Sequence, residues 1–502
     1  MLLAETGNTV TISILHTTDL HGHILPTVDY QGHPDLGGLA RCITQIRQWQ
    51  RENPNYLLLD IGDVYQGTEV SLRAGGANMI RCLNALHYDA WVVGNHEFDW
   101  GIEPFTANVG LSAMPVLSGN SLIEGQPVGS LTDPSHPLFR IKPYLIKEVA
   151  GFRVAIVGIT TPALTTWLPP ENLRGFEVLD PIDTLRVLLR EVKAQKPDAI
   201  ILTGHMGLIR IDDNANRVGS ITEMFPEIAV FIGGHTHQNH SSDIIHRTLY
   251  TQADHYGIYA GKIDLTFDVG SRRLLQSQAV TVPMDAKVAL DPLILSLTQG
   301  DLDAAKLMLS QPVGELMEPF DVQTRFDEPG DVVRLIGSSL RLALRKKGVE
   351  VDAIIHGLFD SKHSLAPGPK TVADVWEVLP YENQIVTFEV DRDGFLALAN
   401  DLAAATNDER NIMGVRLVGS WDGKNYTLRD LAGMNGPLPD KPRYRLAVNS
   451  YDSQSGGQRF PVMARLVKSP GSNRVLHPIQ TRDALIDFFV TQGKVSKTSL
   501  LV

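Results

Sequence analysis

The first half of the chain alternates short apolar runs with segments of helical periodicity. The apolar runs are rich in Val, Ile and Leu and show little polar alternation, which is typical of strands that are covered on both faces. Helical segments are predicted from about residue 38 and over about residues 69–86. The alternation predicts α/β layering. The predicted strands are TISIL (11–15), NYLLLDI (55–61), DAWVV (89–93), RVAIVGI (153–159), DAIILT (198–203) and IAVFIGG (228–234).

The pattern changes after residue 245, where strands such as GKIDLTFDV (261–269) alternate apolar and polar positions. Residues 286–311 are predicted to form a helical connector, because they carry no cluster of catalytic residue types. A second α/β segment follows and ends in a helix over residues 481–493. At 502 residues the chain is too long for one hydrophobic core. We therefore expect two domains, residues 1–285 and 312–502, joined by the connector.

Composition and charge narrow the choice of partners. The chain is 43% hydrophobic and 20% charged, as in ordinary globular proteins. Its formal net charge of −12 repels polyanions, so nucleic-acid polymers and anionic membrane surfaces are not expected partners. A small anionic substrate is compatible with this charge, because a metal ion can reverse the local field. Nothing in the composition indicates an oligomeric state.

Neither cysteine is predicted to do chemistry, since Cys42 and Cys82 both lie in helical apolar patterns typical of buried residues. The N-terminal segment lacks a basic region followed by an apolar one, and no run reaches the roughly 18 apolar residues of a membrane span. The chain as given is expected to be cytoplasmic and not embedded in a membrane. Periplasmic location or export is the alternative if a signal peptide has been removed.

Asp, Asn and His residues follow the ends of five predicted strands. Ligand sites in open α/β sheets gather at the carboxyl ends of strands, which makes this recurrence informative. Each motif alone is also compatible with a turn, because Asp and Gly favour turns. Only the whole set of motifs, in this order along the chain, predicts a ligand site. The residues are Asp19, His21, Asp63, Asn95, His96, Asp99, His205, His235 and His237.

Two Asp, one Asn and four His of this set are candidate metal ligands, and no Cys is among them. That mixture suits divalent ions of borderline hardness, namely Zn, Mn, Fe, Co or Ni. Seven ligands are too many for one tetrahedral ion. They suit two ions that share a bridging carboxylate at a separation of about 3.5–4 Å. The predicted cofactor is therefore a pair of divalent ions of open identity.

The motifs DLHGH, GD, GNHEFD, GH and GHTH together resemble the signature of calcineurin-like metallophosphoesterases over about residues 11–270. With SGGQRF (455–460), the whole chain resembles the bacterial 5′-nucleotidase, UDP-sugar hydrolase and 2′,3′-cyclic-nucleotide phosphodiesterase family. The resemblance implies an N-terminal four-layer α/β/β/α sandwich and a smaller C-terminal α/β domain of the 5′-nucleotidase type. It also implies a phosphohydrolase that cleaves a nucleotide or similar small phosphoester by attack of a metal-bound hydroxide.

The resemblance further assigns roles to the clustered residues. His96 would stabilise or protonate near the leaving oxygen, and Asp99 would orient its imidazole. Glu97 is expected to point away, into solvent or toward a neighbouring loop. The implied ligands are Asp19, His21, Asp63 and His237 for the first ion, and Asp63 as the bridge, Asn95, His205 and His235 for the second.

The C-terminal domain departs from the family where the substrate is recognised. Asp360 stands at the arginine of the usual Asn-Gly-Gly-x-Arg segment, and Gln458 replaces the aspartate of Gly-Gly-Asp. Residues 380–383 read Pro-Tyr-Glu-Asn instead of Pro-Phe-Gly-Asn. Tyr451 is expected to be one of the two rings that hold the base, with simple packing as the alternative, and no second ring is identified. We therefore expect conserved phosphoester chemistry with altered specificity.

Other functions stay open at this point. Within the superfamily, the chain could be a cyclic 2′,3′-phosphodiesterase or a thiosulfate-ester hydrolase. A hypothesis of another class is a non-catalytic relative that only binds a nucleotide. The complete set of metal ligands argues against that hypothesis, since degenerate members of the family tend to lose ligands first.

Overall fold

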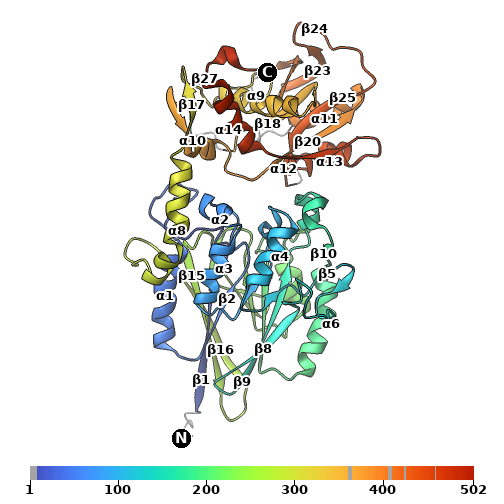
Figure 1. Cartoon of the computed structure of the whole chain (residues 1–502). Helices are drawn as coiled ribbons and strands as arrows, with labels where there is room; N and C mark the ends of the chain where they lie inside the picture. Colours follow the sequence, from blue (N-terminus) through green and yellow to red (C-terminus); the bar gives the residue numbers. More distant parts are fainter. Residues whose placement is uncertain (1–7, 360–363, 405–409, 423–425, 458) are drawn as a thin grey trace. The chain divides into compact units, whose positions relative to one another are not determined.

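The computed structural model describes residues 8–359, 364–404, 410–422, 426–457 and 459–502. These residues form two compact units (Figure 1). The first comprises the described residues up to Thr165 and Pro170–Ala305, and the second comprises Thr166–Pro169 and those of Lys306–Val502. Helix α8 (Pro292–Leu309) runs across this division. The domain limits at 285 and 312 stay a prediction.

The first unit is built on two large sheets. One has seven strands in the order β16-β15-β1-β2-β3-β4-β7, and the other has six in the order β13-β14-β12-β11-β9-β8. Strands β1 to β4 run parallel, as do β9, β11, β12 and β14. The strand bounds are β1 Thr9–Thr17, β2 Tyr56–Asp60, β3 Ala90–Val92, β4 Val116–Leu117, β7 Ile141–Lys142, β8 Tyr144–Val149, β9 Phe152–Thr160, β11 Ala199–His205, β12 Val230–Gly233, β13 Asn239–Ile245, β14 Thr248–Ala253, β15 Tyr259–Asp268 and β16 Leu274–Pro283.

The two sheets pack face to face, because one buried cluster contains Ile14 and Leu59 of the first sheet together with Ile156 and Ile201 of the second. Helices cover the outer faces (Figure 1). A separate cluster joins the second sheet to two of these helices. The layers are thus helix, sheet, sheet, helix, which confirms the expected four-layer sandwich. The helices of this unit are α1 Leu39–Glu52, α2 Glu69–Arg73, α3 Ala77–Ala85, α4 Ile102–Leu111, α6 Pro181–Ala194 and α7 Val218–Met224.

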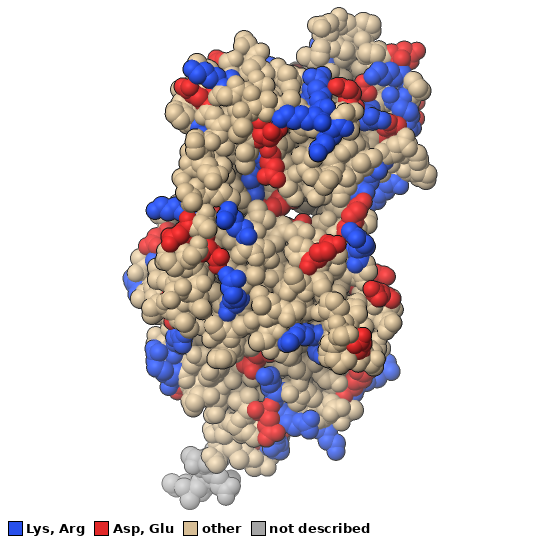
Figure 2. All heavy atoms as spheres, in the orientation of Figure 1, with Lys and Arg blue, Asp and Glu red and all other residues tan. Residues whose placement is uncertain are grey.

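All predicted strands of the first half coincide with observed strands, since their runs were continuous and apolar. Cys42 lies on α1 and Cys82 on α3, and both are buried free thiols as expected. On the face shown in Figure 2, acidic and basic side chains lie side by side over each unit. Among the described residues there is no helix whose length and apolar character would let it span a bilayer.

The second unit is a smaller α/β assembly around a five-stranded mixed sheet in the order β21-β18-β25-β20-β26. Helices α9 and α14 pack in one buried cluster with this sheet, and α11 and α13 pack in another. The bounds are β18 Ala353–Gly357, β20 Gln384–Val390, β21 Arg410–Met413, β25 Tyr444–Asn449, β26 Val475–Gln480, α9 Asp331–Lys346, α10 Val372–Val378, α11 Arg392–Ala404, α12 Ser450–Ser453, α13 Pro461–Lys468 and α14 Thr481–Gln492.

Candidate metal centre

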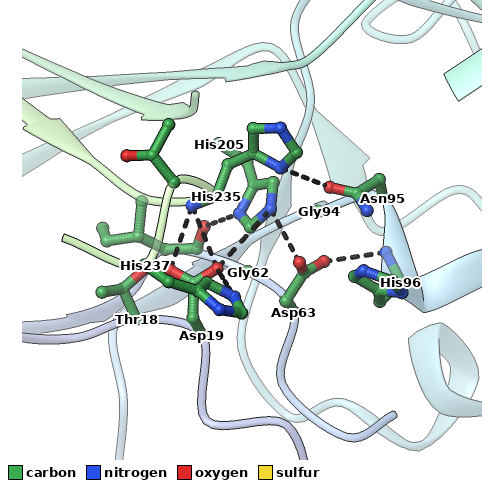
Figure 3. A network of polar contacts seen from close by, with 12 residues as sticks. Thr18, Asp19, Gly62, Asp63, Gly94, Asn95, His96, His205, His235 and His237 are labelled. Atoms are coloured by element: carbon green, nitrogen blue, oxygen red, sulfur yellow. Dashed lines mark hydrogen bonds and ion pairs between the residues drawn. The ribbon is translucent and has the colours of Figure 1, made fainter. Parts of the chain in front are cut away.

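The predicted ligand side chains meet at the carboxyl ends of strands from both sheets of the first unit (Figure 3). Parallel strands end at the same edge of a sheet, so residues far apart in the sequence arrive at one place. Most of the ligand atoms fall into two groups, and within each group they lie within 4.8 Å of one another. The groups are Asp19, His21 and His237, and Asp63, His205 and His235. Asn95 joins the second, with its Oδ1 2.9 Å from His235 Nδ1.

The carboxylate of Asp63 lies between the two groups. Its Oδ2 is 2.9 Å from His205 Nε2 in its own group and 3.7 Å from His21 Nε2 in the other. His205 Nε2 is in turn 3.9 Å from Asp19 Oδ1. A carboxylate that faces ligand atoms of two groups has the position needed to bridge two ions.

Main-chain carbonyls fix the tautomers of two of these histidines. The Nδ1–H of His21 donates to the Gln66 carbonyl, and the Nδ1–H of His205 donates to the Ile61 carbonyl, both at 2.8 Å. Because a carbonyl oxygen can only accept, Nδ1 carries the proton of the neutral ring, and Nε2 is the nitrogen that can bind a cation. Both Nε2 atoms therefore face the centre ready to bind a cation.

Two buried ligand atoms face each other at 2.9 Å, a position in which only a proton or a metal cation between them can satisfy both. Asp63 Oδ2 and His205 Nε2 are buried and make no hydrogen bond. Leaving such atoms without a partner costs about 1–3 kcal/mol each, so they call for a cation. The surrounding Asp, Asn and His atoms suit a divalent ion of borderline hardness. The residues present thus fit the expected metal centre.

The field in the centre is negative. Burial opposes ionisation of Asp19 and Asp63, but the neighbouring histidines outweigh it, lowering the pKa of Asp19 to about 2 and holding that of Asp63 well below its usual range. Burial alone would lower the pKa of His205, yet the charges of Asp63 and Asp19 raise it to about 10. For His21, burial dominates and lowers the pKa to about 3. Ionised, buried carboxylates attract a cation.

The backbone is left-handed at five of the seven predicted ligands. The φ angles are 49° at Asp19, 48° at His21, 53° at Asp63, 74° at His235 and 51° at His237. This region costs a residue other than glycine about 1–3 kcal/mol, and such strain gathers at functional sites. It turns the chain sharply after β1, β2 and β12, which the strand pattern of the sequence does not reveal.

His96 lies beside the ligand groups and its side chain is 35% exposed. Its Nδ1–H donates to Asp99 Oδ2 at 2.8 Å, and its backbone N–H donates to Asp63 Oδ1 at 2.8 Å. Its ring centre is 5.1 Å from that of His21. Burial opposes charge on this imidazole, but Asp99 and Asp63 raise its pKa to about 10. Asp99 thus occupies Nδ1 and leaves Nε2 as the nitrogen that can meet a ligand.

Glu97 turns toward a neighbouring loop, the second of its two expected orientations, and is fully buried. Its Oε2 accepts the N–H groups of Gly94 and Asp63 at 2.7 and 3.0 Å, and its Oε1 accepts that of Val64 at 2.7 Å. Through these three hydrogen bonds, Glu97 ties the loop that carries Asp63 to the loop that carries Asn95. The two loops approach so closely that no side chain fits at Gly94, because a Cβ there would lie only 2.2 Å from Asp63 Oδ1.

Replacing Glu97 by Gln is expected to lower the free energy of unfolding by about 1–3 kcal/mol, because the amide nitrogen cannot accept and strands a buried N–H. Urea unfolding of the whole chain in EDTA measures this effect without contributions from metal binding. Glu103→Gln is the matched control, since the Glu103 side chain is 69% exposed. Equal unfolding midpoints for the two variants would show that Glu97 does not hold the loops.

In the second unit, Tyr451 lies on α12 within a cluster of rings and guanidinium groups. The Arg459 guanidinium is 5.9 Å from the ring centre of Tyr451 and 5.6 Å from that of Phe460. The Arg410 guanidinium is 5.8 Å from the centre of the Phe460 ring. Arg410 itself forms a buried ion pair with Asp452 at 2.7 Å.

The cluster continues to a further tyrosine ring, an exposed one, that was not predicted from the sequence. Arg410 lies 5.7 Å from the ring of Phe359, which meets Tyr381 edge to face at 5.1 Å. Tyr381 is 50% exposed. The signal was the aromatic residue of the Pro-Tyr-Glu-Asn segment, which stands where the family has Phe. The altered positions Asp360 and Gln458 lie outside the described residues.

This chain is similar in sequence and in fold to known proteins. Residues 12–239 match the family model of the calcineurin-like phosphoesterases. The protein UshA of Yersinia enterocolitica is 25% identical over 91% of this chain and 88% of its own length. A 5′-nucleotidase of Vibrio cholerae is 24% identical over 93% of this chain and 88% of its own. The crystal structure of a 5′-nucleotidase precursor from Thermus thermophilus has a TM-score of 0.68 at 23% identity, covering 97% of both chains.

Proposed function

Residues 12–239 form a calcineurin-like phosphoesterase domain, and from this we propose that the protein is a metal-dependent phosphohydrolase that cleaves a nucleotide or a similar small phosphoester. The observation that carries the proposal is the buried Asp63 carboxylate, which faces ligand atoms of both groups at 2.9 and 3.7 Å. A nucleotide substrate is supported by relatives named 5′-nucleotidase that match along most of the chain.

We assign the ligands as the resemblance implies. The first ion would be held by Asp19, His21, Asp63 and His237, and the second by Asp63, Asn95, His205 and His235. When bound, the ions would polarise the phosphoryl group and lower the pKa of the attacking water toward neutrality. Mn, Zn, Fe, Co and Ni all suit these donors.

The other polar side chains handle the leaving group. Asp99 accepts from His96 Nδ1–H and so holds the imidazole in one orientation. His96 Nε2 then stabilises or protonates the leaving oxygen as the bond to phosphorus breaks. No covalent bond between the chain and the substrate is needed.

A screen of phosphoesters with manganese-reconstituted protein tests the proposal. The panel contains nucleoside monophosphates, 2′,3′-cyclic nucleotides, UDP-sugars, a thiosulfate ester and 4-nitrophenyl phosphate. We expect the protein to hydrolyse at least one nucleotide, and we expect EDTA to abolish this hydrolysis. Binding of nucleotides without turnover of any ester would contradict the proposal and favour a non-catalytic relative.

The ring and guanidinium cluster of the second unit is proposed to recognise the organic part of the substrate. Tyr451→Ala is expected to raise KM for a nucleotide about fivefold, equivalent to a stacking contribution of about 1 kcal/mol. The KM for 4-nitrophenyl phosphate should stay unchanged, because this small substrate lacks the nucleoside that the cluster is proposed to hold. Steady-state kinetics with both substrates decide between recognition and packing. Equal losses on both, or no loss on either, would make Tyr451 a packing residue.

A further inference from the structure

His237 differs from His21 and His205, because the partner of its Nδ1 is a side chain and not a main-chain carbonyl. His237 Nδ1 lies 2.7 Å from the hydroxyl oxygen of Tyr30. The corresponding partners of His21 and His205 are carbonyl oxygens, which the fold of the backbone holds in place. The hydrogen bond at His237 Nδ1 therefore comes from an exposed residue.

Tyr30 belongs to a small surface loop between β1 and α1. Two main-chain hydrogen bonds between Thr27 and Leu36, of 2.7 and 3.0 Å, close the base of the loop. Within it, the Asp29 carboxylate accepts the N–H groups of Gln31 and His33. The Tyr30 side chain is 53% exposed, so water can compete for its hydroxyl.

Stacked rings set the direction of the hydroxyl. The ring of Tyr30 stacks on His255 at 4.3 Å with an angle of 15°. His255 is buried and stacks on His237 at 4.8 Å with an angle of 7°. Tyr30 and His237 thus rest on the same buried imidazole, which brings the phenol oxygen to Nδ1.

The other ring nitrogen of His237 faces the metal ligands. Its Nε2 is 3.0 Å from His21 Nε2 and 3.5 Å from Asp19 Oδ1. If Nε2 binds a cation, the proton must lie on Nδ1, and the Nδ1–H needs an acceptor. The Tyr30 hydroxyl oxygen is in place to accept it.

On the basis of the dimetal function proposed above, we propose that Tyr30 is a positioning residue for the ion held by Asp19, His21 and His237. Its hydroxyl accepts the Nδ1–H of His237 and keeps Nε2 turned toward that ion. Because Tyr30 is half exposed on a surface loop, this ion exchanges more readily than the ion held by Asp63, His205 and His235. A hydrogen-bond partner of a ligating histidine contributes about 10- to 100-fold to metal affinity.

Titration of the EDTA-stripped protein with Mn²⁺, followed by the electron paramagnetic resonance signal of free Mn²⁺, tests the inference. The unmodified protein is expected to bind two equivalents, the weaker of which is the exchangeable ion. In Tyr30→Phe, which keeps the ring and loses the hydroxyl, that equivalent should weaken about 10- to 100-fold while the other keeps its affinity. Tyr256→Phe is the matched control, since it removes a neighbouring hydroxyl, 3.3 Å away, and leaves the bond between Tyr30 and His237 in place.

Two unchanged equivalents in Tyr30→Phe would overturn the role of Tyr30 and leave the dimetal proposal standing. Equal weakening in Tyr30→Phe and Tyr256→Phe would also overturn it, because the effect would then not be specific to the bond with His237. Fewer than two equivalents in the unmodified protein would overturn the dimetal proposal, and the inference with it.

Discussion

Asp63→Ala is expected to abolish phosphoester hydrolysis and to remove at least one of the two bound ions. The Asp63 carboxylate faces His205 at 2.9 Å and His21 at 3.7 Å, so in the proposed dimetal centre its loss would remove a ligand from both ions at once. It also removes the acceptor of the His96 backbone N–H. Metal content by mass spectrometry and kcat/KM for 4-nitrophenyl phosphate measure the two effects separately.

The control for this prediction is Asp183→Ala, which removes an Asp of the same unit whose side chain is 77% exposed. Its metal content and kcat/KM should match those of the unmodified protein. If Asp63→Ala still binds two equivalents of metal with normal affinity, Asp63 is not the bridge and the dimetal assignment is wrong.

His96→Asn is expected to lower kcat by roughly 10²–10⁴-fold, the usual contribution of a positioned acid or base. The ring of His96 lies beside the two ligand groups and belongs to neither, so the metal content should not change. Single-turnover kinetics with an aryl phosphate, together with metal analysis of the same sample, test both parts of the prediction.

Asp99→Asn is expected to lower kcat less than His96→Asn does. The amide of the new side chain can still contact His96 Nδ1 but no longer enforces one tautomer of the imidazole. Loss of one metal equivalent in His96→Asn would instead identify His96 as a ligand. The division of roles between Asn95 and His96 would then be wrong.

The fold class and the location of the candidate metal centre could be predicted from the sequence. Continuous apolar runs predicted the strands of the first half, because strands covered by helices on one face and a second sheet on the other must be apolar on both. Asp, Asn and His recur just after those runs, and parallel strands deliver such residues to one edge. For this reason the ordered motifs predicted that Asp63 and His205 would meet, although 142 positions separate them. Their roles as ligands stay a prediction.

The candidate substrate-binding residues of the second unit were harder to predict from the sequence. Tyr451 was identified by its place before a glycine pair, whereas Tyr381 was overlooked even though both border the same arginine cluster. The hydrophobic pattern of a sequence does not show which aromatic rings bind a ligand, because a ring that packs in the core and a ring that binds a ligand can occupy the same kind of position in that pattern.

The sequence by itself determined the alternation of strands and helices and the set of side chains that gather at the strand ends, since both follow from local pattern and strand direction. The four layers were expected only from the resemblance of the motifs to a known family. Only the tertiary structure decided how each of those side chains is held. The Ile61 carbonyl fixes the tautomer of His205, Glu97 joins the two loops, and Tyr30 reaches His237 across 207 positions of sequence. A hydrogen bond depends on distances of a few tenths of an ångström between atoms. Packing sets those distances, and no residue pattern records them.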